Sequence, residues 1–380
     1  MTTVQGVMSG RSRTPSSVVR AWDTREPLAA DFTGRWRDAL RDSPHAHFAF
    51  ELDYLRWESE QGQRSRALMI EGPGRLGLLV QHREARRWVS GWPWRWQALM
   101  WGADPGSPVG MTAADAAWLH EAVARYSAAE TFLSYLPHAP AQGVPGWAAG
   151  ATVIQEIAHS DQDLYDSMEP SKRRLAKRAR GQNVEIRVAS GESEFRAFFQ
   201  LQEASRQRRG LPADPRTKDS RGSGEVWREW ELPWMWLLLA HRNGEVLAGV
   251  GDGIHSGGSM QARTAAASLD ARRLGVTVLL GYEEMRRGRD LGHRWFNFGG
   301  DTPFKREISG RLGRRIRVFG WLGGGRGQKL WQVSEASFRR VRPALARWRR
   351  QLGLARGWAL TVAQTAAGLA PLIPELPSGI

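Results

Sequence analysis

The sequence predicts a mixed α/β protein with two lobes, a largely antiparallel sheet and a basic helical C-terminal segment. Short stretches in which apolar and polar residues alternate are separated by stretches of helical period, which is typical of a sheet covered by helices. A Pro- and Gly-rich stretch at residues 138–150 divides the body. At roughly 100–200 residues per domain, the 380 residues of the chain accommodate two such lobes.

The positive charge of the chain is concentrated near its C-terminus. Of the formal net charge of +15, residues 305–356 carry +13, so the rest of the chain is nearly neutral. The chain has no Cys, which excludes disulfide scaffolds, thiolate nucleophiles and Cys-ligated metal centres. We therefore expect a cytoplasmic protein without a metal, in which any binding to a large anion comes from the C-terminal segment.

The first lobe is predicted to span residues 31–145, after an N-terminal segment, 1–30, that we expect to be flexible. This segment lacks the apolar run of a signal peptide, and a transit peptide is the alternative. In the lobe, the spacing of apolar residues predicts helices at 31–40, 47–60 and 112–126, and strands within 66–80, 85–101 and 131–136. Thr112 is placed to cap the third helix.

The second lobe, residues 151–325, shows a stronger version of the same order. Its predicted elements are a strand at 151–159, a basic helix at 161–180, a strand at 183–189, a helix at 193–208, hairpin strands at 234–267, a loop at 268–275, a helix at 276–290 and strands at 293–299 and 315–322. Asn243-Gly244 is a strong hairpin turn signal. No internal sequence repeat is visible, so a structural duplication of the two lobes is a hypothesis.

The segment 271–288, ARRLGVTVLLGYEEMRRG, is the most informative for chemistry. A short basic loop that contains Gly275 runs directly into a helix, whose first-turn amides lack internal partners and whose dipole favours an anion there. With Arg272 and Arg273 beside it, this helix start is suited to a pyrophosphate group. The alternative is a solvated basic loop before a helix that only packs. Phosphate-loop, nucleophile-elbow and H-E-x-x-H motifs are absent.

Arg272-x-x-Gly275-x-Thr277 resembles the R/Q-x-x-G-x-G/A loop of the GNAT N-acyltransferases, and departs from it at Thr277. The resemblance implies that Arg272, Arg273, Gly275, Val276 and Thr277 bind the pyrophosphate of an acyl-CoA such as acetyl-CoA. It also implies a tandem of two GNAT-like lobes over residues 31–322, in which the second lobe binds most of the acyl donor and acceptor.

The run from Leu291 to Lys305 resembles one GNAT branch more closely. This branch contains acetyltransferases associated with cellulose and exopolysaccharide synthesis and is related to the Fem-type peptidoglycan-bridge aminoacyltransferases. Its typical run is G-x-x-x-φ-D-F-x-x-G-D-x-x-Y-K, where φ is apolar; here Asn297 stands for the first Asp, Phe304 for the Tyr, and one gap is a residue shorter. The segments 171–180 and 208–212 are also similar to this branch.

Candidate catalytic and substrate-binding residues follow from these positions. Asp301 and Lys305 lie on a loop just past a strand end, where an Asp–Lys pair deprotonates an acceptor or anchors it; a loop salt bridge is the alternative. His255 and Asp252 lie in the hairpin region, near where GNAT enzymes often place a base, although a lone His there is more often structural. Three further residues are expected to contact substrate: Tyr282, Asn297 and Phe304.

Two further features concern partners. Trp92, Trp94 and Trp96 share one face if they lie on a strand, where they stack on a saccharide or pack in the core. The C-terminal segment 326–380 is predicted to be a basic amphipathic helical tail. Its residues 326–360 suit an anionic membrane surface, while nucleic acid or packing on the body are the alternatives.

The sequence therefore favours an acyltransferase that moves an acyl group from acyl-CoA to an amine or hydroxyl of a cell-envelope or exopolysaccharide-related acceptor, such as a saccharide. We expect it in the cytoplasm, peripheral at the inner face of the membrane. Two alternatives stay open: a tRNA-dependent aminoacyltransferase of the Fem type, and a non-catalytic GNAT-like scaffold that binds an anionic membrane or partner.

Overall fold

A computed structural model of the chain describes residues 3–4, 17–41, 43, 46, 48–61, 65–82, 96–102, 112–126, 132–140, 142, 144, 146–210 and 227–323. The predicted tail at 326–380, the side chains of the row at Trp92, Trp94 and Trp96, and Pro212 lie outside the described residues.

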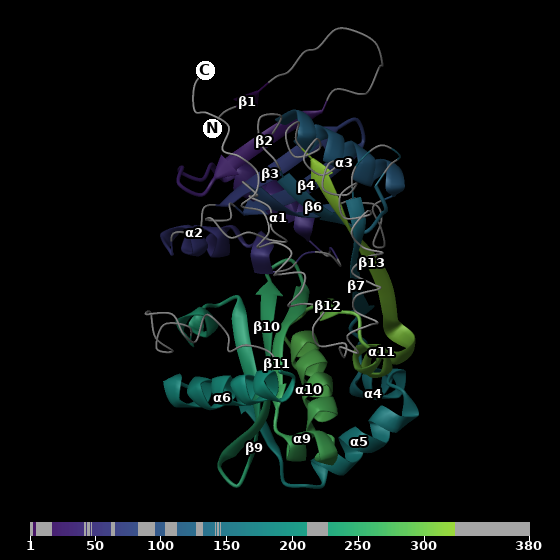
Figure 1. Cartoon of the computed structure of the whole chain (residues 1–380). Coiled ribbons are helices and arrows are strands. Elements are labelled where there is room, and N and C mark those ends of the chain that lie inside the picture. The colour runs from purple at the N-terminus through teal and green to yellow at the C-terminus, as the bar shows by residue number, and fades with distance from the viewer. Residues whose placement is uncertain are drawn as a thin grey trace, which may run out of the picture.

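The described strands form one continuous sheet, in the order β1-β2-β3-β4-β5-β6-β13-β7-β12-β11-β10-β9-β8 (Figure 1). Their bounds are β1 Thr3–Val4, β2 Val18–Asp23, β3 Ser65–Gly72, β4 Arg75–His82, β5 Trp96–Gly102, β6 Phe132–Leu136, β7 Gly146–Glu156, β8 Glu185–Val188, β9 Met235–Arg242, β10 Glu245–His255, β11 Ser259–Ala267, β12 Trp295–Gly300 and β13 Gly313–Gly323. Neighbours pair antiparallel except β5 with β6 and β11 with β12.

The helices are α1 Ala30–Leu40, α2 Leu52–Glu60, α3 Ala113–Tyr126, α4 Asp161–Ser167, α5 Pro170–Arg180, α6 Glu192–Arg208, α9 Leu269–Leu274, α10 Val276–Asp290 and α11 Pro303–Ser309. The short 3-10 helices are η1 Phe48–Phe50, η2 Trp227–Glu231 and η3 Gly310–Leu312. Alternation along the strands decides which helices each face receives. In β3, Leu68 and Ile70 face α3, whereas Ala67 and Met69 face α1 and α2.

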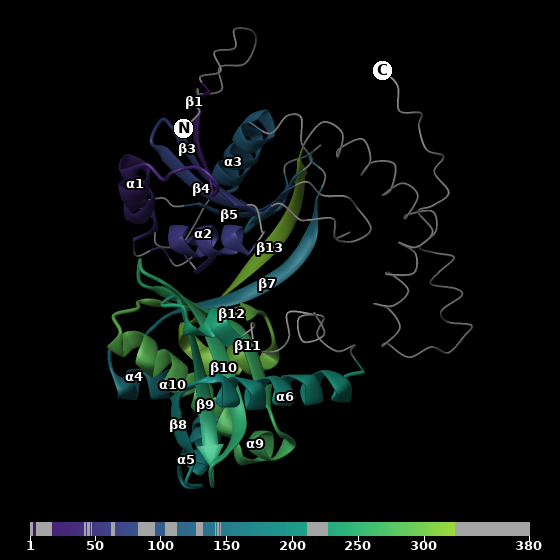
Figure 2. The ribbon, with the colours of Figure 1, turned by 90° about the vertical axis from the view of Figure 1, so that its left-hand side faces the viewer.

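The two lobes repeat one topology. In the first, β3, β4 and β5 form an antiparallel meander, and α3 then crosses to β6, which is parallel to β5. In the second, β9, β10 and β11 do the same, and α9 and α10 cross to β12. The long strands β7 and β13 lie between the two sets and run from one lobe into the other (Figure 2). The order of elements thus supports the structural duplication.

A single apolar cluster joins the lobes. Trp36, Phe50 and Leu55 of the first lobe belong to the same buried cluster as Phe198 of α6 and Leu237 of β9. On the opposite face of the second lobe, Trp236 and Leu238 of β9 pack beneath α10. The lobes therefore share a core.

Three predictions about elements need correction. Part of the segment 1–30 is ordered, because β2 pairs with β3 and buries Trp22 against α1 and α2. The stretch 138–150 is only partly a linker, because β7 already begins at Gly146. The loop at 268–275 is instead the short helix α9, whose first turn is capped by Ser268 accepting from the Ala271 N–H at 3.0 Å.

Candidate active site

The parallel strands β11 and β12 pair only at their N-terminal ends. Ser259, Met260 and Gln261 lie opposite Trp295, Phe296 and Asn297, and the two strands separate beyond that point. Each keeps its other neighbour, because β11 stays paired with β10, and β12 with β7. Where the strands part, the pairing of β11 with β10 also slips, which leaves Arg263 as an extra residue between Ala262 and Thr264. Backbone groups on the facing edges thus become available to a ligand.

The end of β12 is fixed by Asn297. Its Oδ1 accepts from the Gly299 N–H at 2.8 Å and contacts the Thr152 hydroxyl at 2.5 Å. Gly299 has a φ of 72°, and a Cβ there would lie 3.2 Å from the Ala262 carbonyl oxygen and 3.5 Å from Lys305 Nζ. The buried Asn297 side chain thus shapes the strand end, which is a structural role; its contact with substrate stays a prediction.

Lys305 reaches the separation of β11 and β12 from the first turn of α11. Thr302 caps this helix by accepting from the Lys305 N–H at 3.3 Å, and Pro303 occupies the first helical position. The Lys305 ammonium donates to the Phe298 carbonyl of β12. Burial lowers the pKa of this lysine, and the nearby carboxyl of Glu284 acts in the opposite direction.

Asp252 and Glu284 form a buried carboxyl pair, and the charge of Glu284 interacts with that of Lys305. Asp252 on β10 has no exposed surface, and Glu284 on α10 is 4% exposed. Trp236 Nε1–H donates to Asp252 Oδ2, and the two carboxyl groups contact each other. Burial raises the pKa of Asp252 to about 6 and raises that of Glu284 well above its ordinary value.

Glu284 is not among the site residues that the sequence predicts, although its position carries a signal. It follows Val276 and Leu280 at intervals of four residues and so lies on the apolar stripe of α10. A charged residue on such a stripe needs a partner in the core.

Asp301 does not pair with Lys305. Its carboxylate accepts from Arg306 Nη1 at 2.7 Å and from Arg315 Nε, while its backbone N–H donates to the Ala151 carbonyl at 2.8 Å. The bond from Arg315, together with Arg306, lowers the pKa of Asp301. The predicted Asp–Lys pair is therefore replaced by an ion-pair cluster that ties β12, α11 and β13 together.

His255 lies at the junction of the two lobes. Its Nδ1 accepts from the Gly257 N–H at 2.9 Å, which assigns the hydrogen of the neutral ring to Nε2, 3.8 Å from Glu51 Oε1. Burial lowers the pKa of His255. Because residues three apart on a strand point to opposite faces, His255 lies on the other side of the sheet from Asp252. The structure does not bring it to Lys305.

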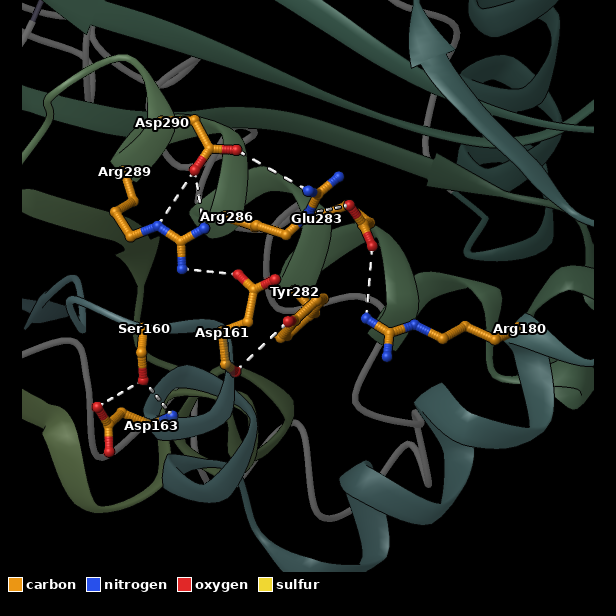
Figure 3. Close-up of polar contacts among 9 residues, drawn as sticks. All are labelled: Ser160, Asp161, Asp163, Arg180, Tyr282, Glu283, Arg286, Arg289 and Asp290. Atoms are coloured by element: carbon orange, nitrogen blue, oxygen red, sulfur yellow. Dashed lines mark hydrogen bonds and ion pairs between the residues drawn. The ribbon is translucent and has the colours of Figure 1, made fainter.

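Tyr282 is buried in the packing of α10 against α4 and α5 (Figure 3). Its hydroxyl donates to the Asp161 carbonyl at 3.4 Å, and the Arg180 guanidinium lies 4.7 Å from the ring centroid. Arg180 also pairs with Glu283 at 3.5 Å, and Arg289 with Asp161 at 2.6 Å. These contacts give Tyr282 a packing role, and its contact with substrate stays a prediction.

The predicted donor site lies at the start of α10. Gly275 has a φ of 85°, and a Cβ there would lie 2.7 Å from the Leu175 carbonyl oxygen of α5. Arg272 and Arg273 are exposed, Thr277 is half-buried, and Val276 is buried. The Gly thus permits close packing on α5 and leaves the first-turn amides at the end of a helix with basic neighbours.

Phe304, at the start of α11, is 38% exposed, and Lys172 Nζ lies 5.4 Å from its ring centroid. Among the described residues, no group of His, Asp and Glu side chains is arranged to hold a metal ion. No described helix is both long and apolar enough to span a membrane.

Residues 170–306 match the family model described as an acetyltransferase (GNAT) domain. These residues lie in the second lobe, and the match is consistent with an enzyme of the acyltransferase class. The predicted α/β tandem of GNAT-like lobes is confirmed.

Several solved structures are similar to the chain. FemX is 12% identical, with a TM-score of 0.54 over 82% of this chain and 99% of FemX, and shares the fold. A tandem GNAT protein from the clavulanic acid biosynthesis pathway is 13% identical, with a TM-score of 0.41 over 81% and 99% of the two chains. The C-terminal domain of a putative lysylphosphatidylglycerol synthetase from Agrobacterium fabrum is 14% identical, with a TM-score of 0.42 over 69% and 85%. No curated protein matches significantly in sequence.

Proposed function

We propose that the chain transfers an acyl group directly from acyl-CoA to an amine or hydroxyl of its acceptor. One observation carries the proposal: within the residues that match a GNAT acetyltransferase domain, the Lys305 ammonium lies where the two parallel strands β11 and β12 separate. A cation at this point stabilises the oxyanion that forms when a thioester carbonyl is attacked.

The start of α10 supports the assignment of acyl-CoA, such as acetyl-CoA, as the donor. Its dipole and first-turn amides favour the pyrophosphate, and the exposed Arg272 and Arg273 add positive charge. In the reaction, the acceptor nitrogen or oxygen attacks the thioester carbonyl carbon and the C–S bond breaks. The proton that the acceptor loses is taken up by the departing thiolate.

A cell-envelope or exopolysaccharide-related acceptor, a saccharide or another amine or hydroxyl compound, is the finer proposal. It is supported by the run from Leu291 to Lys305, in which Asn297 keeps the acceptor oxygen that an Asp would supply. A cytoplasmic location at the inner membrane face, reached through residues 326–360, belongs to the same proposal.

Calorimetric titration with acetyl-CoA tests the donor. We expect binding by the wild type and its loss in the double variant Arg272→Ala/Arg273→Ala, because the two exposed positive charges beside the helix start are removed. Arg56→Ala, an exposed arginine of the first lobe, serves as control and should bind like the wild type. Absence of heat with every acyl-CoA, or unchanged binding by the double variant, would reject the proposal.

A tRNA-dependent aminoacyl transfer is the second candidate. It is favoured by the basic surface on which Arg174, Lys177 and Arg178 of α5 are exposed, with Arg272 and Arg273 of α9 nearby. Filter binding of tRNA over a salt series discriminates the two, since a phosphate-dependent contact weakens steeply with salt. Tight, salt-sensitive tRNA binding without acyl-CoA binding would favour this candidate.

A further inference from the structure

The buried pair Asp252 and Glu284 has two oxygens that no donor satisfies among the described residues. They are Asp252 Oδ1 and Glu284 Oε1. One carboxyl comes from β10 and the other from α10, and both lie in the core between the sheet and the helix. Two ionised carboxylates in contact there would repel each other and lack the solvation that each needs.

One proton shared by the two carboxyl groups removes the repulsion between them and gives the unsatisfied oxygens a hydrogen bond. A protonated carboxyl supplies an O–H donor, and its ionised partner supplies the acceptor, so the two unsatisfied oxygens satisfy each other. The Trp236 Nε1–H bond to Asp252 favours the negative charge on Asp252 and the proton on Glu284. The pair then carries one negative charge in place of two, and it titrates as a unit.

The single negative charge matches the single positive charge of Lys305. Glu284 is the carboxyl that interacts with Lys305, and the Phe298 carbonyl takes one of the three ammonium hydrogens. The pair and the ammonium together have no net charge, which allows all three to lie inside the lobe. The strand residues opposite Asp252, Trp236 of β9 and Ala262 of β11, are neutral.

We propose that Asp252 and Glu284 share one proton and act as positioning residues for Lys305, whose ammonium they hold at the separation of β11 and β12 and whose protonation they set. The part that Lys305 plays in acyl transfer rests on the proposed function, whereas the shared proton does not.

Titration of Lys305 by NMR tests this proposal without any substrate. The sequence contains only five lysines, so selective ¹³C labelling of lysine gives few signals, and Lys305→Arg identifies the one of interest. In Glu284→Gln the negative charge stays on Asp252, where the wild type already holds it, so the pKa of Lys305 should change little. In Asp252→Asn, Glu284 loses its repelling neighbour and ionises beside the ammonium, so the pKa of Lys305 should rise. This rise should reach about one unit.

Glu283→Gln is the matched control. Glu283 is adjacent in the sequence but pairs outward with Arg180 and Arg286, so this variant should leave the pKa of Lys305 unchanged. An equal shift in Glu284→Gln and Asp252→Asn, or no rise in Asp252→Asn, would overturn the proposal, because general loss of packing does not raise the pKa of Lys305 in one of the two variants alone.

Infrared spectroscopy supplies a measurement that does not depend on the folding of Asp252→Asn. At pH 7 the wild type and Glu283→Gln should show the band of a protonated carboxyl, and a wild type without it would overturn the proposal. Neither experiment uses acyl-CoA. A failure of acyl-CoA binding therefore leaves the shared proton intact, and absence of the shared proton leaves the donor assignment intact.

Discussion

At the scale of single residues, an oxygen acceptor at position 297 is what the strand end requires. The Asn297 side-chain oxygen receives the Gly299 N–H and contacts the Thr152 hydroxyl in a buried setting. The amide and a carboxylate are interchangeable in this role. The departure from the typical Asp of the resembled branch is thus compatible with the same local structure.

Asn297→Leu is expected to destabilise the protein. It leaves the Gly299 N–H without its acceptor in the core, at a cost of about 1–3 kcal/mol for each unsatisfied group. Urea denaturation followed by circular dichroism measures the change. Asn297→Asp keeps the oxygen and should cost clearly less; equal losses in the two variants would contradict this role.

Gly275→Ala should be more destabilising than Gly292→Ala. Both residues have a positive φ, 85° and 84°, but a Cβ at Gly275 meets the Leu175 carbonyl, whereas a Cβ at Gly292 meets nothing within 4 Å. The backbone strain of about 1–2 kcal/mol is common to both. The difference between the unfolding free energies of the two variants therefore measures the cost of the contact with α5. Equal free energies would mean that α5 shifts at no cost to accommodate the added Cβ.

The ion pairs of Asp301 should make the stability of the folded protein depend on pH. Its pKa in the folded protein lies below the ordinary value of 3.8 because Arg315 and Arg306 bind the carboxylate. The stabilisation is thus present above pH 3.8 and is lost as the pH falls through the lowered pKa. The melting temperature of the wild type should exceed that of Asp301→Asn at pH 7, and this gap should narrow toward pH 3. A constant gap would mean that the ion pairs do not contribute.

At the scale of elements, α11 positions Lys305 through its N-cap. Thr302→Ala should cost about 0.5–2 kcal/mol of stability and weaken acyl transfer, because the first turn carries Lys305. Ser160→Ala removes the matching cap of α4, where Ser160 accepts from the Asp163 N–H at 3.0 Å. It should cost a similar amount of stability without loss of transfer. Equal loss of activity in both variants would argue against this role of α11.

Several elements could be predicted from local signals. Asn243 and Gly244 adopt positive φ values of 53° and 81° in the expected hairpin turn, and the period of α6 and α10 is clear in the sequence. The six-residue helix α9 was mistaken for a loop, because so short a helix shows less than two turns of periodicity. Strand β2 was missed because its Arg and Ser surroundings conceal the buried Val19 and Trp22.

The candidate site was only partly predictable. The run that ends at Lys305 indicates the position of the lysine. The carboxyl that interacts with this lysine, Glu284, belongs to α10, which is more than a dozen residues away in the sequence. Proximity of Asp301 and Lys305 in the chain suggested a pair, whereas the turn into α11 points the two side chains to different neighbours. Such choices depend on tertiary packing rather than on local pattern.

At the scale of the whole molecule, the two lobes should unfold together. The buried cluster shared by α1, α2, α6 and β9, together with the strands β7 and β13, leaves no boundary at which the lobes separate without exposing part of the buried core. Tryptophan fluorescence and far-ultraviolet circular dichroism should therefore report the same midpoint in urea. Two separated transitions would show that the lobes are independent.

The separation of β11 and β12 has a mechanical consequence for the enzyme. The two sides of the gap are anchored to different supports: β11 is hydrogen-bonded to β10 inside the second lobe, whereas β12 is hydrogen-bonded to β7, which continues into the first lobe. The gap can therefore widen or narrow without breaking either of these ladders. The first lobe also contacts the β11 side, because the Ser259 hydroxyl donates to the Ala46 carbonyl, so a movement of the first lobe is transmitted to both edges of the site.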